Sequence, residues 1–213
     1  MVNISTTITK KDLLDSLVAR TSKEQVQKFQ NATVAICGLG GLGSNIAISL
    51  ARAGVGNLIL IDFDKVDISN LNRQQYKLCQ VGMYKTDALS TNLAEITNLC
   101  NIKTYTVKLQ EDNYLQYLNS ADIVCEAFDN AEEKSKLVNF VLENLRNTFV
   151  VSASGMANLD SPNKIVTKKI TNRFYLSGDG ENSTDDGGSL YAPRVMLCAS
   201  HQATTILNII AEN

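Results

Sequence analysis

The chain has 213 residues, of which 44% are hydrophobic and 20% are charged, and its formal net charge is -2 with a pI near 5.5. This length accommodates one α/β domain with an extension, because about 150 residues already bury a full core. The small negative charge excludes the large cationic surface that binds nucleic acid or an anionic membrane, so we expect neither partner.

The first 32 residues predict a helical extension to a main domain that occupies residues 33–213. Apolar residues recur at helical spacing over 10–17, behind Thr9 as a favourable N-cap, and a second short helix is expected over 23–29. This helix pair should pack on the domain or on a neighbouring subunit. The segment lacks the apolar core of a signal peptide, and no run approaches the roughly 18 apolar residues of a membrane span, which predicts a cytoplasmic protein.

Residues 33–64 predict a strand over 33–37, a glycine turn, a helix that runs to Arg52 and a second strand over 57–61. Glycines let the backbone turn tightly and approach a phosphate, whose charge is then met by amide hydrogens and by the positive end of the helix dipole. Asp62 ends the second strand about 20 residues later, where a carboxylate of this fold accepts a hydrogen bond from a ribose hydroxyl. The alternative is a plain strand-to-helix turn with a solvated Asp62. The strand before the turn and the helix after it favour a nucleotide site.

Residues 64–82 predict a loop at the carboxyl end of that strand, where ligands bind in open α/β sheets. Asx and serine side chains are frequent there and compete for backbone hydrogen bonds. A helical period begins at Tyr84 and places Lys85 in the first turn. Because the helix dipole opposes a lysine at that position, Lys85 either meets an anion or is a plain exposed lysine.

Three further strands are expected over 102–107, 122–126 and 149–153, with helices over 113–118 and 131–145 between them. This alternation predicts a Rossmann-like, doubly wound α/β fold with a mostly parallel sheet. Asp129 follows the second of these strands. It either caps the next helix or holds Mg²⁺ beside a nucleotide phosphate, because this cation takes oxygen ligands and usually only one or two protein carboxylates.

The C-terminal part predicts an antiparallel hairpin over 164–178, at the sheet edge, and a helix that begins at Ala192. Residues 178–189 between them carry no core-forming pattern and should be mobile. Cys198 and His201 share a face of the helix, but a packed cysteine is favoured over a nucleophile with its base, because reactive thiols need an exposed electropositive setting. The five scattered cysteines include no CxxC pair, so we expect reduced thiols and no structural zinc.

Together these motifs resemble the ThiF/MoeB/HesA superfamily, the bacterial relatives of ubiquitin-activating enzymes. The resemblance lies in GLGGLGS at 38–44, DFD at 62–64, the specific SNLNRQ at 69–74, Lys85, and the pair Asp129 and Asn130. The tail, with SASGMA, FYLSGDG and APRVMLCASHQA, is similar to short bacterial ThiF proteins. Zinc-binding CxxC pairs and a cysteine between residues 154 and 189 are absent, so a covalent acyl step is in doubt and a separate protein would donate sulfur.

The resemblance implies ATP-dependent adenylation of the C-terminal glycine carboxylate of a small ubiquitin-like sulfur carrier ending in Gly-Gly, in thiamine biosynthesis, by a homodimer. A carboxylate and a triphosphate repel each other, so attack on the α-phosphorus needs cations that neutralise both. Arg73, Lys85 and Asp129 with Mg²⁺ are therefore the catalytic candidates. The implied nucleotide contacts come from Gly40, Gly41, Asp62, Asp64, Ser69, Asn70, Arg73, Gln74, Lys85 and Asn130, with Arg20 reaching the ATP of the partner subunit.

Three alternatives stay open. A related enzyme could load the carrier of molybdopterin synthase instead. An NAD-dependent oxidoreductase would use the same glycine turn, but it has no need for Asn70, Arg73 and Lys85 in one pocket. A non-catalytic binding module would keep the fold and recruit a ubiquitin-like tail, although the intact Asp62 and Asp129 argue against it.

Overall fold

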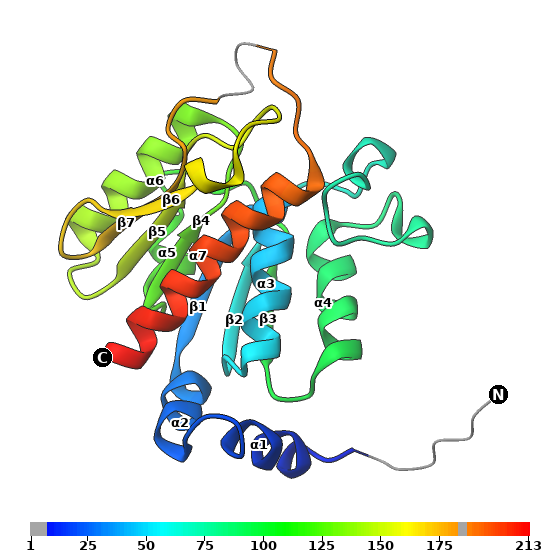
Figure 1. Ribbon diagram of the computed structural model, residues 1–213, viewed down its shortest axis with the longest axis vertical. Helices are drawn as coiled ribbons and strands as arrows, with labels where there is room; N and C mark the ends of the chain where they lie inside the picture. Colours follow the sequence, from blue (N-terminus) through cyan, green and yellow to red (C-terminus); the bar gives the residue numbers. More distant parts are fainter. Residues whose placement is uncertain (1–7, 183–186) are drawn as a thin grey trace.

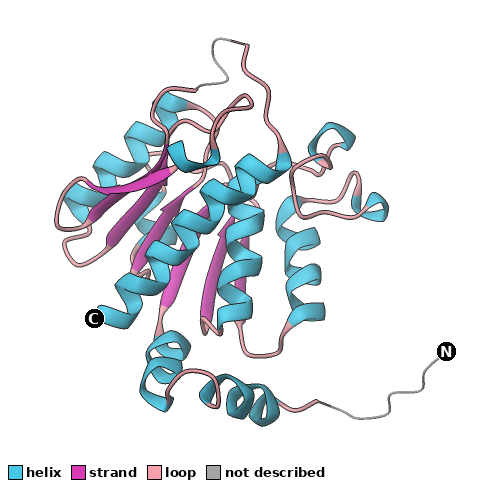
Figure 2. Ribbon diagram, in the orientation of Figure 1, coloured by secondary structure: helices cyan, strands magenta, loops and turns pink. Residues whose placement is uncertain are grey.

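The computed structural model describes residues 8–182 and 187–213, and this part of the chain contains one seven-stranded sheet with helices on both faces (Figures 1 and 2). The strand order is β3-β2-β1-β4-β5-β7-β6, and every pairing is parallel except that of β6 with β7. This arrangement confirms the predicted Rossmann-like fold. The strands are β1 (Thr33–Cys37), β2 (Asn57–Ile61), β3 (Asn101–Tyr105), β4 (Ile123–Glu126), β5 (Phe149–Ala153), β6 (Val166–Lys169) and β7 (Phe174–Gly178).

The two faces of the sheet bury two separate apolar clusters, because side chains alternate along each strand. In β1, Val34 and Ile36 belong to one cluster, and Ala35 and Cys37 belong to the other. One face is covered by α3 (Gly41–Ala53), α4 (Lys85–Ile96) and α7 (Ala192–Glu212), and the opposite face by α5 (Tyr114–Leu118) and α6 (Ala131–Asn144) (Figure 1). Among the described helices, none combines the length and the apolar character that a bilayer span requires.

The two N-terminal helices lie at the amino ends of the strands, at the opposite edge of the sheet from the glycine turn (Figure 1). They are α1 (Lys10–Val18), which Thr9 caps as predicted, and α2 (Lys23–Asn31). Val26 and Phe29 of α2 are buried, and the Lys28 ammonium donates to the Ala211 carbonyl at 2.7 Å. Helix α2 therefore packs on the main domain itself, through α7.

Strand bounds follow the sequence closely, with one instructive difference at the sheet edge. The bounds of β1, β2 and β5 are those predicted, and the β6–β7 hairpin is confirmed. The third predicted strand, 102–107, instead runs from Asn101 to Tyr105. Its only described neighbour is β2, whose ends pair Asn57 with Asn101 and Ile61 with Tyr105, so the strand ends where its partner ends.

The prediction that residues 178–189 are mobile is wrong for the first of them. The Asp179 side chain is 1% exposed and pairs with Arg194. Its carboxylate also accepts a hydrogen bond from the Asn182 amide, so these residues are held in place. Residues 183–186 lie outside the described residues.

Candidate functional site

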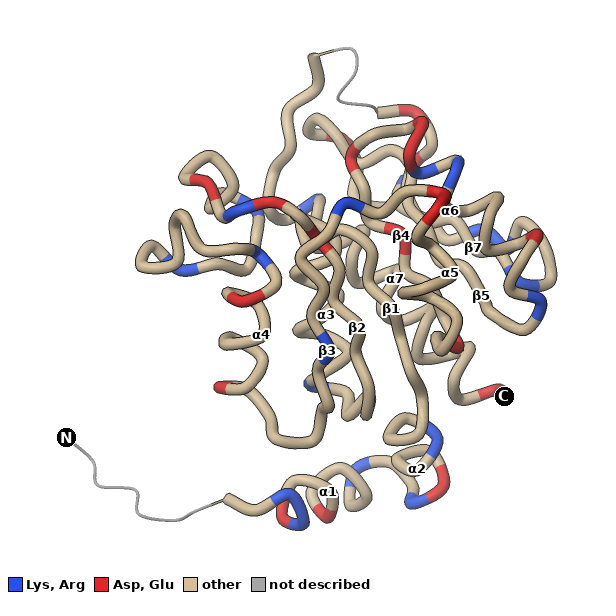
Figure 3. The backbone as a smooth tube through the Cα atoms, turned by 180° about the vertical axis from the view of Figure 1, so that it is seen from behind, with Lys and Arg blue, Asp and Glu red and all other residues tan. Residues whose placement is uncertain are grey.

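A cavity of about 740 Å³ lies at the carboxyl ends of β1, β2, β4 and β5. Charged residues of both signs gather along this edge of the sheet, seen from behind in Figure 3. One side of the cavity, which we call the glycine-turn side, is lined by Gly40, Gly41, Asp62, Arg73 and Lys85. The other, which we call the β5 side, is lined by residues 153–157 and Asn182.

The glycine turn is closed by contacts that leave no room for side chains. A Cβ on Gly43 would lie 1.9 Å from the Gly38 carbonyl oxygen, and Gly38 has a φ of +91°, which favours glycine. Helix α3 begins behind Gly40, which as a glycine provides no capping side chain. The first amides of α3 are therefore available at the cavity, where the helix dipole also favours an anion.

Asp62 is a buried anchor of this turn, which contradicts the solvated strand end that the alternative expected. Its side chain is 7% exposed, and its two oxygens accept hydrogen bonds from the amides of Leu39, at 2.7 Å, and Asp64, at 2.8 Å. Burial raises the pKa of Asp62, against the lowering effect of the Lys85 ammonium and of the two amides. Asp62 lines the cavity, and its carboxylate can accept further hydrogen bonds.

Lys85 is not an exposed lysine either, because only 7% of its side chain is accessible. Its ammonium lies 2.8 Å from Asp64 Oδ2 and 3.8 Å from Asp62 Oδ2. These carboxylates compensate for a cation that the dipole of α4 disfavours. A fixed positive charge thus lies at the cavity wall, between two acidic partners.

The loop between β2 and α4 supplies the second cation. Arg73 lines the cavity, and its Nη1 donates to the Ser69 carbonyl at 3.3 Å and to Asn72 Oδ1 at 2.9 Å. Asn70 and Gln74 line it too, and Gln74 Oε1 has no hydrogen-bond partner among the residues that the structure describes. Ser69 does not line the cavity, and its hydroxyl donates to Asp67 Oδ1 at 2.6 Å. Ser69 instead holds Arg73 through its carbonyl.

Asp129 and Asn130 both line the cavity but have different tasks. Asn130 is the N-cap of α6 and accepts from the Glu133 amide at 2.9 Å, so the prediction that Asp129 could cap this helix is wrong. Asp129 is exposed and does not cap the helix. No cluster of three or more His, Cys, Asp or Glu side chains suited to a metal occurs in residues 8–182 and 187–213. A single carboxylate beside an anion site fits Mg²⁺, which completes its shell with phosphate and water.

Arg20 lies in the turn between α1 and α2, at the opposite edge of the sheet, and does not line the cavity of its own chain. Its contact with the ATP of a partner subunit stays a prediction.

The cysteines take no part in the cavity. Cys37, Cys125 and Cys198 are buried, and burial raises the pKa of each thiol, that of Cys198 to about 12. His201 Nδ1 lies 3.2 Å from the Thr167 hydroxyl, which confirms the packed interpretation of the Cys198 and His201 pair. Burial also raises the pKa of Cys100, to about 11, and of the five thiols only Cys79 is exposed.

One buried ionic group beside the cavity was not predicted. The Glu126 side chain is fully buried at the end of β4, where it accepts from the Lys134 ammonium at 2.5 Å, from the Phe128 amide at 2.6 Å and from the Ser152 hydroxyl. Lys134 lines the cavity. The sequence does contain a signal for this group, a glutamate at the end of an otherwise apolar central strand. Such a glutamate predicts a buried partner, because an ionised side chain is almost never buried without one.

The fold and the cavity define a Rossmann-like α/β protein with a ligand-sized cavity over a glycine turn. The ThiF family pattern matches residues 14–213, and the chain belongs to the ThiF family.

Two curated relatives and one solved structure place the chain within this family. It is 36% identical over 165 residues to the tRNA threonylcarbamoyladenosine dehydratase of Bacillus subtilis (strain 168), a match that covers 76% of this chain and 61% of that protein. It is 38% identical over 112 residues to the molybdopterin-synthase adenylyltransferase of Haemophilus influenzae, covering 52% of this chain and 46% of that protein. The chain therefore spans less than two thirds of either relative.

The fold matches the crystal structure of the E. coli tRNA threonylcarbamoyladenosine dehydratase TcdA in complex with ATP, with a TM-score of 0.84. That match covers 96% of this chain and 97% of the other at 21% identity, so it bears on the fold alone.

Proposed function

We propose that this protein uses ATP to adenylate a carboxylate, with release of pyrophosphate. The observation that carries the proposal is that four features meet at one cavity. They are the uncapped N-terminus of α3 at Gly41, the cations of Arg73 and Lys85, and the carboxylate of Asp129. A nicotinamide cofactor would need the glycine turn and Asp62 only. Arg73 and Lys85, which such a cofactor does not need, suit the phosphate oxygens of a triphosphate.

In this reaction a carboxylate oxygen attacks the α-phosphorus, a new C–O–P linkage forms, and the bond from that phosphorus to the pyrophosphate oxygen breaks. Arg73 offers a planar fork for phosphate oxygens, and Lys85 offers a compact charge at the wall. Both cations screen the repulsion between the attacking carboxylate and ATP. They also stabilise the negative charge that builds on the departing pyrophosphate. No nucleophile from the protein is needed, in agreement with a cavity lining that contains no cysteine among the described residues.

Asp129 would be the protein carboxylate that holds Mg²⁺. The neighbouring Asn130 side chain caps α6 instead. When bound, this cation neutralises phosphate charge and orients the phosphates. Asp62 would accept from the ribose hydroxyls, and Gly40 would leave the backbone open to the phosphates.

The substrate that the cavity suits best is the C-terminal glycine carboxylate of a small ubiquitin-like sulfur carrier, as in thiamine biosynthesis. Small residues line the β5 side, including Ala153, Gly155 and Ala157, and they leave room for a main chain without side chains. A molybdopterin-synthase carrier would fit the same chemistry, and one relative bears that name. Assembly as a homodimer, with Arg20 on the partner's nucleotide, belongs to this proposal.

A second candidate rests on the match to a tRNA-modifying relative, which suggests a carboxylate linked to RNA. The net charge of -2 argues against it, because non-specific attraction to RNA depends on excess Lys and Arg.

The test is isotope exchange. With ATP, Mg²⁺ and labelled pyrophosphate, we expect label to enter ATP only when a carrier ending in Gly-Gly is present, and mass spectrometry to find AMP on that carrier. A carrier that lacks its last glycine is the matched control. Exchange with tRNA bearing threonylcarbamoyladenosine, and with no carrier, would favour the second candidate. Carrier binding without any AMP transfer would contradict adenylation.

A further inference from the structure

A buried ion pair lies behind the β5 side of the cavity. Arg194, in the first turn of α7, pairs through Nη2 with Oδ2 of Asp179, which follows β7. Their side chains are 6% and 1% exposed. The dipole of α7 disfavours an arginine there, and a buried ion pair often stabilises a fold no better than apolar residues of the same size. Stability alone therefore does not explain these two residues.

The pair joins three segments that are distant in the sequence. Arg194 Nη1 donates to the carbonyls of Asp160, at 3.0 Å, and Ser161, at 3.2 Å, in the segment after β5. Asp179 Oδ1 accepts from the amides of Glu181 and Asn182, each at 2.9 Å, and so closes the turn after β7. The guanidinium thus ties α7, the segment after β5 and the turn after β7 to one point.

The turn that Asp179 closes then holds the cavity wall. The Asn182 carbonyl accepts from the amides of Met156 and Ala157, each at 3.1 Å, and all three residues line the cavity. The contacts therefore run from Arg194 through Asp179 and Asn182 to the wall. None of them passes through the glycine-turn side.

The wall and the turn after β7 approach each other too closely for side chains at two positions. Gly155 has a φ of +81°, and a Cβ there would lie 2.1 Å from Asp179 Oδ1. Gly178 has a φ of +136°, and its Cβ would lie 1.9 Å from the Ser154 carbonyl oxygen. The two strands of chain can approach this closely only because both positions are glycine.

We propose that Arg194 and Asp179 are positioning residues for the acyl substrate: they fix the wall over residues 154–157, and so set the affinity for the carboxylate partner without affecting ATP. The role in substrate affinity rests on the proposed adenylation. The fixing of the wall does not, and it is tested separately.

The first test is amide hydrogen exchange on Arg194→Met. We expect exchange over residues 155–158 to accelerate about tenfold or more, because the wall opens locally, while residues 38–43 and ATP affinity stay as in the wild type. Unchanged protection over 155–158 would overturn the proposal, and so would equal loss of protection in both regions. If Arg194→Met does not fold, Asp179→Asn takes its place, since it keeps the oxygen that accepts from the amides of Glu181 and Asn182 and replaces the oxygen that accepts from Arg194 by an NH2 donor.

Arg173→Met is the matched control. Arg173 precedes β7 at the opposite end of the sheet. Its guanidinium donates to three carbonyls, those of Leu142, Leu145 and Thr148, each at 2.8 Å, where that of Arg194 donates to two carbonyls and a carboxylate. The same substitution there should leave the exchange of residues 155–158 unchanged. Acceleration at 155–158 in this control would assign the effect to general destabilisation and would overturn the proposal.

The second test is kinetic. In carrier-dependent pyrophosphate exchange, Arg194→Met should raise KM for the carrier by about tenfold, with KM for ATP within about twofold of the wild type. An unchanged KM for the carrier would overturn the substrate role. A wild type that exchanges with no carrier would instead contradict the proposed function, and the hydrogen-exchange result would still decide whether the pair fixes the wall.

Discussion

The two sides of the cavity are built in different ways. The glycine-turn side comes from one continuous stretch, residues 38–85, in which each strand end is followed at once by its functional residue. The β5 side comes from segments after β5 and β7 that the pair of Arg194 and Asp179 holds to α7. A site made from consecutive elements is visible in the sequence, whereas a site made from tertiary contacts is not.

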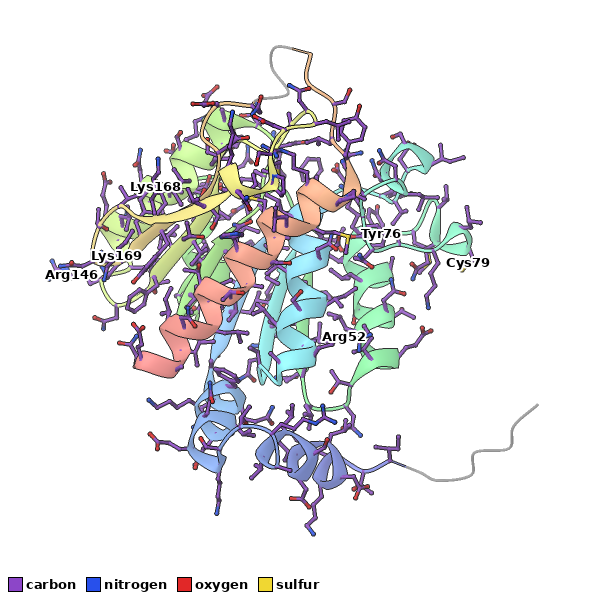
Figure 4. All side chains as sticks on the ribbon, viewed as in Figure 1. Arg52, Tyr76, Cys79, Arg146, Lys168 and Lys169 are labelled. Atoms are coloured by element: carbon purple, nitrogen blue, oxygen red, sulfur yellow. The ribbon has the colours of Figure 1, made fainter. Side chains whose placement is uncertain are left out.

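The largest expected effect is on the glycine-turn side. Arg73→Ala should lower carrier-dependent pyrophosphate exchange by about 10² to 10³, which is the usual loss when one preorganised donor to the transition state is removed. The midpoint of thermal unfolding should not change, because Arg73 is not fully buried. Arg52→Ala is the control, since Arg52 lies exposed near the far end of α3 (Figure 4). Activity of Arg73→Ala within a few-fold of the wild type would remove this residue from the mechanism.

A matched pair of glycine variants would sharpen the comparison. Gly43→Ala and Gly155→Ala introduce the same methyl group at 1.9 and 2.1 Å from an oxygen, the first within the glycine turn and the second on the β5 side. We expect Gly43→Ala to weaken ATP binding by about tenfold or more, and Gly155→Ala to leave ATP binding unchanged while it raises KM for the carrier. Calorimetric titration with ATP and the exchange assay measure the two effects. Loss of ATP binding in both variants would mean that the two sides are not independent.

The smallest expected effect is a pH dependence of stability on the β5 side. Burial alone would raise the pKa of Asp179, but hydrogen bonds from Asn182, Glu181 and Arg194 outweigh it and lower the pKa from 3.8 to about 2. Because the folded-state pKa is lowered, this stabilisation is present above about pH 4 and is lost as the pH falls toward about 2. The free energy of unfolding should therefore lose about 2 kcal/mol more in the wild type than in Asp179→Asn over that range. Parallel curves from urea unfolding would contradict the shift.

The sequence predicted most of the fold because the apolar strands are bounded by residues that cannot continue them. The bounds of β5 and of the β2 strand before Asp62 were predictable for that reason. Strand β3 was placed less well, because an edge strand with exposed positions has a weak pattern and takes its register from β2.

The site was predictable to the extent that its chemistry was local. Lys85 was visible as a cation against a helix dipole, and Arg194 carries the same signal in α7. What the sequence could not provide was the partner of each charge. Asp64 lies 21 positions before Lys85 and Asp179 lies 15 positions before Arg194, and in both cases the folded sheet brings the two together.

The distribution of the thiols has a practical consequence. Cys79 lies exposed in the same loop that carries Asn70, Arg73 and Gln74 (Figure 4). The thiols of Cys37, Cys125 and Cys198 are buried, and burial raises the pKa of the half-buried Cys100 thiol to about 11, which keeps it protonated at neutral pH. A maleimide fluorophore at neutral pH should therefore attach to the natural protein at one place, without any cysteine being removed. Such a reporter would follow the β2–α4 loop in real time as nucleotide arrives.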